Sequence, residues 1–521
     1  MTSIVRIRRW AVAAIVLALT LGLGGGVTAQ DGDAASSTLV EDALFGIRTV
    51  APSGWTGMGN GIHVRGDGEG DTTVILQRSA PISNADLWPR LLPQIEQTEI
   101  PEQTGALSTA DLDWSLHAFT IDQPTGGLNV EVAVAEDDGT SYLIIFQAAT
   151  DEFDALRELA LVPALAAFAP IAPEPTVDPA TLGYSVEEVR FRGGAADVDL
   201  AGTLSLPPGP GPHPVVVLMS GSGLQDRDEA LTGVATIKPF ALIADALTSA
   251  GVGVLRYDDR GAGSSTGESG GTIEELTEDG AAALDYLVTR EDVDPERLGL
   301  LGHSEGGIYA ARIGARDPRV AFIVMMAGPA VDGVSLLIEQ TEALARSAGE
   351  SEAAVAAVRT FAETGIPAAR EADEDAVEAA GRTLFGTLWD MQPEAGRAAL
   401  GPRDEFIEDR LELQAPVLLS DWYRSILAYD PAPDLAAIDV PMLALYGGLD
   451  MQVLSPQNEP AFVAATVGND DATAVVLPDA NHLFQAAETG SILEYGQLAD
   501  DFTPEFLPTL VDWVVARTAT E

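Results

Sequence analysis

A short glycine-flanked segment places a serine where it can act as a nucleophile. The segment Gly-His-Ser-Glu-Gly spans residues 302–306, with Ser304 at its centre. A serine hydroxyl attacks acyl groups when a strained turn between a strand and a helix exposes it above a sheet. The chain contains 52 glycines, and the same G-x-S-x-G pattern also occurs at residues 263–267 and 267–271. The pattern alone therefore does not select one serine.

The residues around each match separate them. Residues 297–301, Arg-Leu-Gly-Leu-Leu, have the composition of a buried strand, and the residues after 306 favour a helix. The other two matches lie in a Gly/Ser/Thr-rich run in which no helix is predicted to begin at the serine. We therefore take Ser304 as the candidate nucleophile; the alternative is a serine in a tight structural turn.

A serine nucleophile needs a base within hydrogen-bonding reach, and the chain has five histidines. His63 and His117 lie in the N-terminal part, and His213 precedes a predicted strand, at the wrong end for this site. His303 lies inside the serine motif, where its side chain is expected to point away. His482 follows a predicted strand, where parallel sheets carry their chemistry, so it is the candidate base rather than a surface-loop histidine.

The residue that orients the base is expected to lie between the serine and the histidine in chain order. Asp450 follows a strand-like segment, residues 442–446, which ends in two glycines. Asp430 and Asp434 precede that segment, and Asp479 is too near His482 in sequence to face it. Asp450 is the favoured candidate among 80 acidic residues.

Acyl transfer also requires donors for the negative charge that develops on the carbonyl oxygen. One expected donor is the backbone N–H of Glu305, the residue after the nucleophile. The other is expected in residues 220–223, Ser-Gly-Ser-Gly, which follow the predicted strand 215–219. The Ser222 N–H is the candidate, with Gly223 as the alternative, and a plain strand-end turn is the non-functional interpretation.

The elements that position these residues form two predicted units. Residues 183–519 alternate short apolar runs with helical stretches, which predicts an α/β fold with a mostly parallel sheet covered by helices on both faces. An Ala- and Glu-rich region, about 330–430, predicts a helical cap inserted into this sheet. Residues 41–168 predict a small α+β domain, and residues 169–182, rich in proline, predict a stiff linker.

The N-terminus has the pattern of an export signal. Three arginines precede an apolar run, residues 10–23, which is short for a membrane span of roughly 20 residues. Small residues follow at 27–29, so residues 1–29 are a predicted signal peptide. We expect an exported protein, secreted, periplasmic or at the cell surface; a retained N-terminal membrane anchor is the alternative.

Charge and composition exclude several classes of partner. The formal net charge of −52 disfavours binding to nucleic acid and to anionic membranes. The chain has no cysteine, and its histidines show no metal-binding spacing, so we expect neither a metal nor another cofactor. The expected partner is a small-molecule substrate, and the oligomeric state stays open.

Several ordered segments resemble those of one enzyme superfamily. Residues 220–228, 256–264, 302–307, 446–450 and 481–482 together are similar to the α/β-hydrolases, in particular to bacterial esterases of the serine-aminopeptidase-like and dienelactone-hydrolase-like groups. The resemblance covers about residues 183–519. It implies an α/β-hydrolase fold and hydrolysis of carboxylic esters through an acyl-enzyme, with the cap shaping the acyl pocket. One departure is Ser220-Gly221, where many relatives have His-Gly, so the resemblance does not identify the second oxyanion donor.

Other functions fit the same residues less well. A peptidase can use the same three side chains, and acidic residues of the cap, including Glu371 and Asp373, can hold a free amine or simply form a solvated face. An acyl thioesterase and a non-catalytic binding protein are further alternatives. The N-terminal unit is similar, over about 125 residues, to the extrinsic proteins of the oxygen-evolving complex, and no catalytic set is predicted there.

Overall fold

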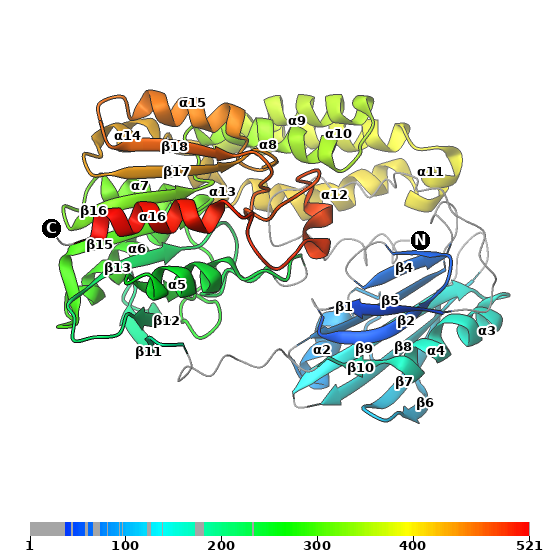
Figure 1. Cartoon of the computed structure of the whole chain (residues 1–521). Coiled ribbons are helices and arrows are strands. Elements are labelled where there is room, and N and C mark those ends of the chain that lie inside the picture. The colour runs from blue at the N-terminus through cyan, green and yellow to red at the C-terminus, as the bar shows by residue number, and fades with distance from the viewer. Residues whose placement is uncertain are drawn as a thin grey trace.

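The computed structural model describes residues 37–42, 45–57, 61–65, 73–80, 82–92, 94–95, 97–121, 127–137, 139–171, 182–231 and 234–519. They form a smaller N-terminal and a larger C-terminal unit (Figure 1). The predicted signal peptide lies outside these residues, as does most of the predicted linker, and the domain boundaries proposed above stay predictions. Within the described ranges, no helix is both long and apolar enough to cross a membrane.

The C-terminal unit is built on one eight-stranded sheet with the order β11-β12-β14-β13-β15-β16-β17-β18. The strands are β11 (Ser185–Arg192), β12 (Asp199–Leu206), β13 (His213–Met219), β14 (Gly253–Tyr257), β15 (Val293–His303), β16 (Val320–Met326), β17 (Met442–Gly447) and β18 (Ala472–Leu477). The β11–β12 and β12–β14 pairs are antiparallel and all the others are parallel. The carboxyl ends of β13, β15, β17 and β18 therefore meet at one edge of the sheet.

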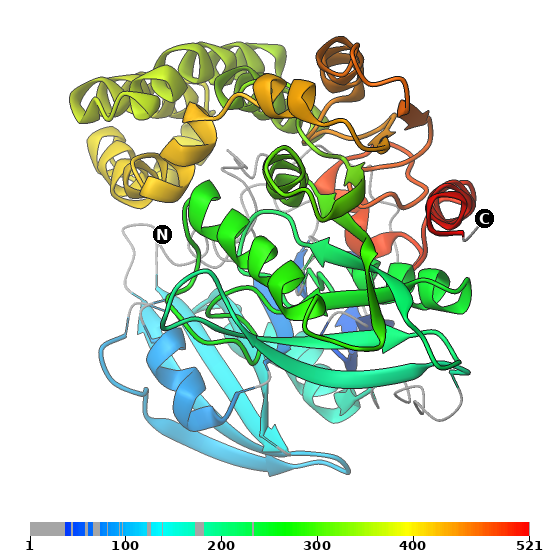
Figure 2. The same ribbon diagram turned by 90° about the vertical axis from the view of Figure 1, so that its left-hand side faces the viewer.

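Helices cover both faces of this sheet, as the alternating pattern predicts. On one face α5 (Pro239–Ser249) contacts α16 (Phe506–Thr518), and on the other α6 (Ile273–Leu287), α7 (Glu305–Gly314), α14 (Ala432–Ala437) and α15 (Ser455–Ala465) contact one another in turn (Figures 1 and 2). Local sequence fixes where they begin: Thr272 and Glu275 form a reciprocal capping box at the start of α6. The predicted α/β-hydrolase fold is confirmed.

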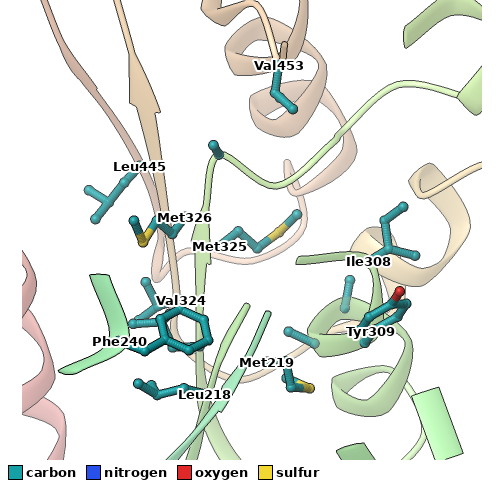
Figure 3. Close-up of a cluster of buried hydrophobic side chains, with 14 of the residues drawn as sticks. Leu218, Met219, Phe240, Ile308, Tyr309, Val324, Met325, Met326, Leu445 and Val453 are labelled. Carbon is teal, nitrogen blue, oxygen red and sulfur yellow. The ribbon is translucent and has the colours of Figure 1, made fainter. Parts of the chain in front are cut away.

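Side chains on alternate strand positions pack against the two helix layers. Figure 3 shows Phe240 of α5 beside Leu218 and Val324, whereas Ile308 and Tyr309 of α7 lie on the opposite side, toward Met219. Because successive strand residues face opposite sides of a sheet, β13 contributes to both layers of the core. These side chains are almost fully buried, which holds the strand ends, and the residues that follow them, in fixed positions.

A helical insertion separates β16 from β17, in agreement with the predicted cap. It consists of α8 (Gly333–Ser347), α9 (Glu352–Arg370), α10 (Glu374–Asp390), α11 (Glu394–Leu400), α12 (Arg403–Leu418) and α13 (Asp421–Ala428). Side chains of Asp332, Ser351, Asp373 and Ser420 accept hydrogen bonds from the first turns of α8, α9, α10 and α13. The last of these helices, α13, contacts α8, α9 and also α6 of the sheet layer, which brings the cap over the sheet.

The N-terminal unit is an antiparallel sheet in the order β3-β4-β5-β9-β8-β7-β6, accompanied by a small sheet β1-β2-β10. Its strands are β1 (Ser37–Asp42), β2 (Ile47–Pro52), β3 (Trp55–Gly57), β4 (Ile62–Arg65), β5 (Val74–Ala80), β6 (Gln103–Ser108), β7 (Asp113–Ile121), β8 (Leu128–Asp137), β9 (Thr140–Ala149) and β10 (Ala169–Pro170). The helix α2 (Asn84–Leu91) packs on one face, and the helical stretch α3 (Phe153–Leu156), η1 (Arg157–Leu161) and α4 (Val162–Ala167) packs on the other. Trp88 and Trp114 are buried in these two cores. The resemblance to the extrinsic proteins stays a prediction.

Candidate active site

Ser304 lies at a sharp turn between the end of β15 and the start of α7. Its backbone has φ 52° and ψ −119°, in a region that residues other than glycine rarely adopt. A side chain on Gly302 would collide with the carbonyl of Gly306, and one on Gly306 would collide with the carbonyl of Met219. The two glycines of the motif are therefore required by the turn itself. The other two pattern matches lie between β14 and α6, where no helix begins at the serine.

The candidate base and its orienting carboxylate lie in the loops that follow β18 and β17. His482 Nδ1 is 2.8 Å from Asp450 Oδ2, and both side chains are almost fully buried. The second oxygen of Asp450 accepts hydrogen bonds from the N–H groups of Gln452 (2.7 Å) and Val453 (2.9 Å), which fix its orientation. When Nδ1–H donates to the carboxylate, Nε2 of His482 is the nitrogen left to accept a proton.

Ser304 and His482 line one cavity between the sheet edge and the cap. Both the loops at the carboxyl ends of the strands and the helices of the cap contribute side chains to its lining. Gln225, Glu229 and Glu305 give one part of the lining a polar character, whereas the cap contributes mainly apolar surface, including Leu336 and Ile426. The described residues that line it include no lysine or arginine, so a negatively charged substrate gains no counter-charge there.

The two predicted oxyanion donors lie at this same cavity. Glu305 is the first residue of α7, and the first N–H groups of a helix have no partner within the helix. Ser222 also lines the cavity, whereas the N–H of its neighbour Gly221 already donates to Glu229 Oε1 (2.7 Å). Ser222 and Glu305 therefore stay the candidate donors, with Gly223 as the alternative to Ser222, and their role stays a prediction.

The side chain of Glu305 is buried beside the nucleophile and joins three parts of the fold. It accepts hydrogen bonds from the hydroxyl of Tyr309 (2.6 Å) and the indole N–H of Trp422 (3.1 Å), and a further hydrogen bond joins it to the side chain of Ser222. Burial raises the pKa of this carboxyl, while the three hydrogen bonds oppose the shift. Sequence reasoning assigned only the backbone of Glu305 and missed this contact with the cap.

A second carboxyl, that of the partly buried Asp259, lies beneath the loop that follows β13. Asp259 accepts hydrogen bonds from the Ser220 hydroxyl (2.8 Å) and the Gln225 N–H (3.1 Å). Burial raises the pKa of Asp259 to about 8, against the effect of these hydrogen bonds, and the nearby charges of Glu229 and Glu305 add to the rise. Asp259 therefore holds the loop on which the candidate oxyanion donor lies.

The expectation that His303 points away from the site is wrong. Its ring lines the same cavity and lies 4.8 Å from the ring of His482, centre to centre. The reason is that the loop carrying His482 folds over the end of β15, so that His303 Nε2 lies 3.0 Å from the His482 carbonyl oxygen. Its Nδ1 lies 2.7 Å from Oε1 of Glu229. Glu229 was not selected from the sequence.

Comparisons with known proteins agree with this architecture. The family model described as "Serine aminopeptidase, S33" matches residues 234–381. Esterase EstD of Thermotoga maritima is 25% identical over 407 residues, which cover 78% of this chain and 80% of the relative. The putative hydrolase YtaP of Bacillus subtilis is 33% identical over 129 residues, covering 22% of this chain and 43% of the relative.

Two solved structures are similar to this chain at low sequence identity. An esterase of Pyrococcus furiosus is 14% identical and covers 66% of this chain and 96% of its own, with a TM-score of 0.40. An α/β-hydrolase of a Penicillium species is 17% identical and covers 64% of this chain and 99% of its own, also with a TM-score of 0.40.

Proposed function

We propose that this chain, which belongs to the α/β-hydrolase superfamily, hydrolyses carboxylic esters through an acyl-enzyme formed on Ser304. One observation carries the proposal: the serine at the strained turn shares its cavity with His482, whose Nδ1 is bonded to Asp450. The similarity to Esterase EstD, along most of both chains, supports an ester as the substrate. The expected partner is a small uncharged or cationic ester, because the cavity lining offers acidic side chains and no lysine or arginine.

In this mechanism Ser304 Oγ attacks the ester carbonyl carbon while His482 Nε2 takes the hydroxyl proton. The N–H groups of Glu305 and Ser222 stabilise the oxyanion, and Asp450 stabilises the imidazolium. The imidazolium then gives its proton to the departing alkoxide, which leaves as the alcohol. A water molecule next attacks the acyl-enzyme, His482 accepts its proton and returns it to Ser304, and the carboxylic acid is released.

Hydrolysis of p-nitrophenyl esters of short and long acyl chains tests this proposal directly. The wild-type protein should release p-nitrophenol, and Ser304→Ala should lose roughly four or more orders of magnitude in kcat. Ser269→Ala is the matched control, since Ser269 is the exposed centre of another pattern match. Ester turnover that survives in S304A but is lost in S269A would show that Ser304 is not the nucleophile.

An amide-cleaving peptidase is the second candidate function. The description of the matching family model favours it, as do the two carboxylates in the cavity lining, Glu229 and Glu305, which suit a free amine. Aminoacyl-p-nitroanilides assayed beside the esters distinguish the two. Amide turnover that depends on Ser304, without comparable ester turnover, would favour the peptidase.

We also propose that the protein is exported, because residues 1–29 have the composition of a signal peptide. Fractionation of expressing cells, followed by N-terminal sequencing, tests this. A new N-terminus near residue 30 in the exported fraction supports cleavage, an intact N-terminus in the membrane fraction supports an anchor, and intact protein in the cytoplasm contradicts export.

A further inference from the structure

Glu229 connects two loops of the active site from a buried position. Its Oε1 accepts hydrogen bonds from the Gly221 N–H and from His303 Nδ1, both at 2.7 Å, and its side chain is only 2% exposed. Its Oε2 has no hydrogen-bond partner among the described residues, so the contacts of the carboxylate are concentrated on Oε1. Through these contacts Glu229 links the loop after β13 to the last residue of β15.

The contacts of His303 extend this link to the base. Its Nδ1 faces the Glu229 carboxylate, and its Nε2 faces the carbonyl oxygen of His482 at 3.0 Å. A carbonyl oxygen only accepts hydrogen bonds, so Nε2 must carry a proton. A second proton must lie between Nδ1 and Oε1. If the proton between Nδ1 and Oε1 is lost, two acceptors without a proton face each other, and the hydrogen bond between His303 and Glu229 is lost.

The charges around the ring favour its doubly protonated form. Burial by itself lowers the pKa of His303, but the charge and hydrogen bond of Glu229 outweigh it, with smaller contributions from the His482 carbonyl and the charge of Asp450. The pKa of His303 is therefore raised above its ordinary value. Glu229, Asp450 and the ring of His482 are the titratable groups that face it, and Glu229 is the one in direct contact with its Nδ1.

We propose that Glu229 is a positioning residue, which acts through His303 on the main chain of His482 and through Gly221 on the candidate oxyanion loop. The inference rests on the proposed hydrolysis at Ser304. It assigns Glu229 no contact with the reacting atoms. Its effect follows from geometry, because a displacement of about 1 Å in a catalytic group costs on the order of 100-fold in rate.

Glu229→Gln tests this inference, because it preserves shape and removes charge. At low pH the imidazolium still forms, but without the carboxylate His303 loses its proton at a lower pH than in the wild type. We expect kcat for p-nitrophenyl butyrate to fall by about 10- to 100-fold on the alkaline side, with KM changed by less than about twofold. The deficit should shrink as the pH falls, and a purely structural role would not move the alkaline limb.

The matched control is Glu131→Gln, a buried carboxylate that pairs with Arg157 in the N-terminal unit. An alkaline limb of E229Q that coincides with those of E131Q and the wild type would overturn the inference. If E229Q fails to fold, as judged by circular dichroism, His303→Gln replaces it. The kcat of the His303→Gln variant should be about tenfold below that of the wild type, and a wild-type kcat in this variant would overturn the inference.

The same experiment separates failure of the inference from failure of the proposed function. Ester turnover that is absent from the wild type, or unchanged in S304A, contradicts the function itself. Turnover that depends on Ser304 and has the same pH profile in E229Q leaves the function standing and overturns only the role of Glu229.

Discussion

Trp422, on cap helix α13, donates its indole N–H to the carboxylate of Glu305, the residue that follows the candidate nucleophile, at 3.1 Å from Oε1 and 3.3 Å from Oε2. The cap is therefore bonded to the first turn of α7, not merely placed above it. Because the same carboxylate also accepts from Tyr309, the position of the cap, the wall of the cavity and the helix behind Ser304 depend on one buried group.

Trp422→Phe should reduce kcat/KM for ester substrates by about tenfold, because it removes a hydrogen bond to a buried carboxylate and keeps most of the ring. Most of the loss is expected in KM, since the cavity wall shifts while Ser304 and His482 stay in place. Steady-state kinetics across acyl chain lengths measures this effect. Trp389→Phe is the control: it removes an indole hydrogen bond to the Gly401 carbonyl within the cap, and it should leave kcat/KM unchanged.

Asp450→Asn should reduce kcat by about three to four orders of magnitude, the size of effect seen when an orienting carboxylate of a serine–histidine pair is made neutral. The amide no longer stabilises an imidazolium and permits the wrong tautomer of His482. Asp479→Asn is the control, because Asp479 is exposed and lies three residues before the base. A D450N variant with wild-type kcat would show that another carboxylate orients His482.

Much of this site is predictable from the sequence, because its main residues follow recognisable elements. Ser304, Asp450 and His482 come after apolar runs that form β15, β17 and β18, and parallel strands bring such positions to one edge. In the C-terminal sheet, the two strands that pair antiparallel, β11 and β12, were not predicted. The residues of β11 alternate apolar with charged side chains in the manner of an exposed edge strand, so no continuous apolar run marks it.

The supporting residues are not predictable in the same way. Glu229 is one of 80 acidic residues, and only the folding of the loop after β13 toward His303 distinguishes it from the others. Trp422 lies about 120 residues after Ser304, in a cap whose helices pack by their own apolar faces, so nothing in its local sequence indicates a contact with Glu305. Contacts of this kind depend on tertiary packing and not on a local pattern.

Glu350→Gln should stabilise the protein at pH 8 and have little effect near pH 4.5. Glu350 is buried in the cap, neither carboxylate oxygen has a hydrogen-bond partner among the described residues, and burial raises its pKa to about 7. The folded state therefore binds the proton more tightly than the unfolded state, and stability falls as the pH rises from about 4.5 to about 7.

The gain in unfolding free energy should be on the order of 1–3 kcal/mol above pH 7, measured by thermal or urea unfolding at several pH values. Glu371→Gln is the control, since that side chain is 75% exposed in the same cap. An E350Q variant whose stability differs from that of wild type by the same amount at every pH would show that Glu350 does not titrate in this range.

Deletion of residues 30–170 should leave ester hydrolysis largely intact, with kcat within about twofold of the full chain. Every described residue that lines the cavity comes from the C-terminal unit, between Gly221 and Leu483. The core of that unit begins at Val189 and shares no residue with the two cores of the N-terminal unit, so each unit buries its own apolar surface. The truncated chain carrying Ser304→Ala provides the background rate. Cooperative thermal unfolding of the truncated protein without esterase activity would instead mean that the N-terminal unit completes the site.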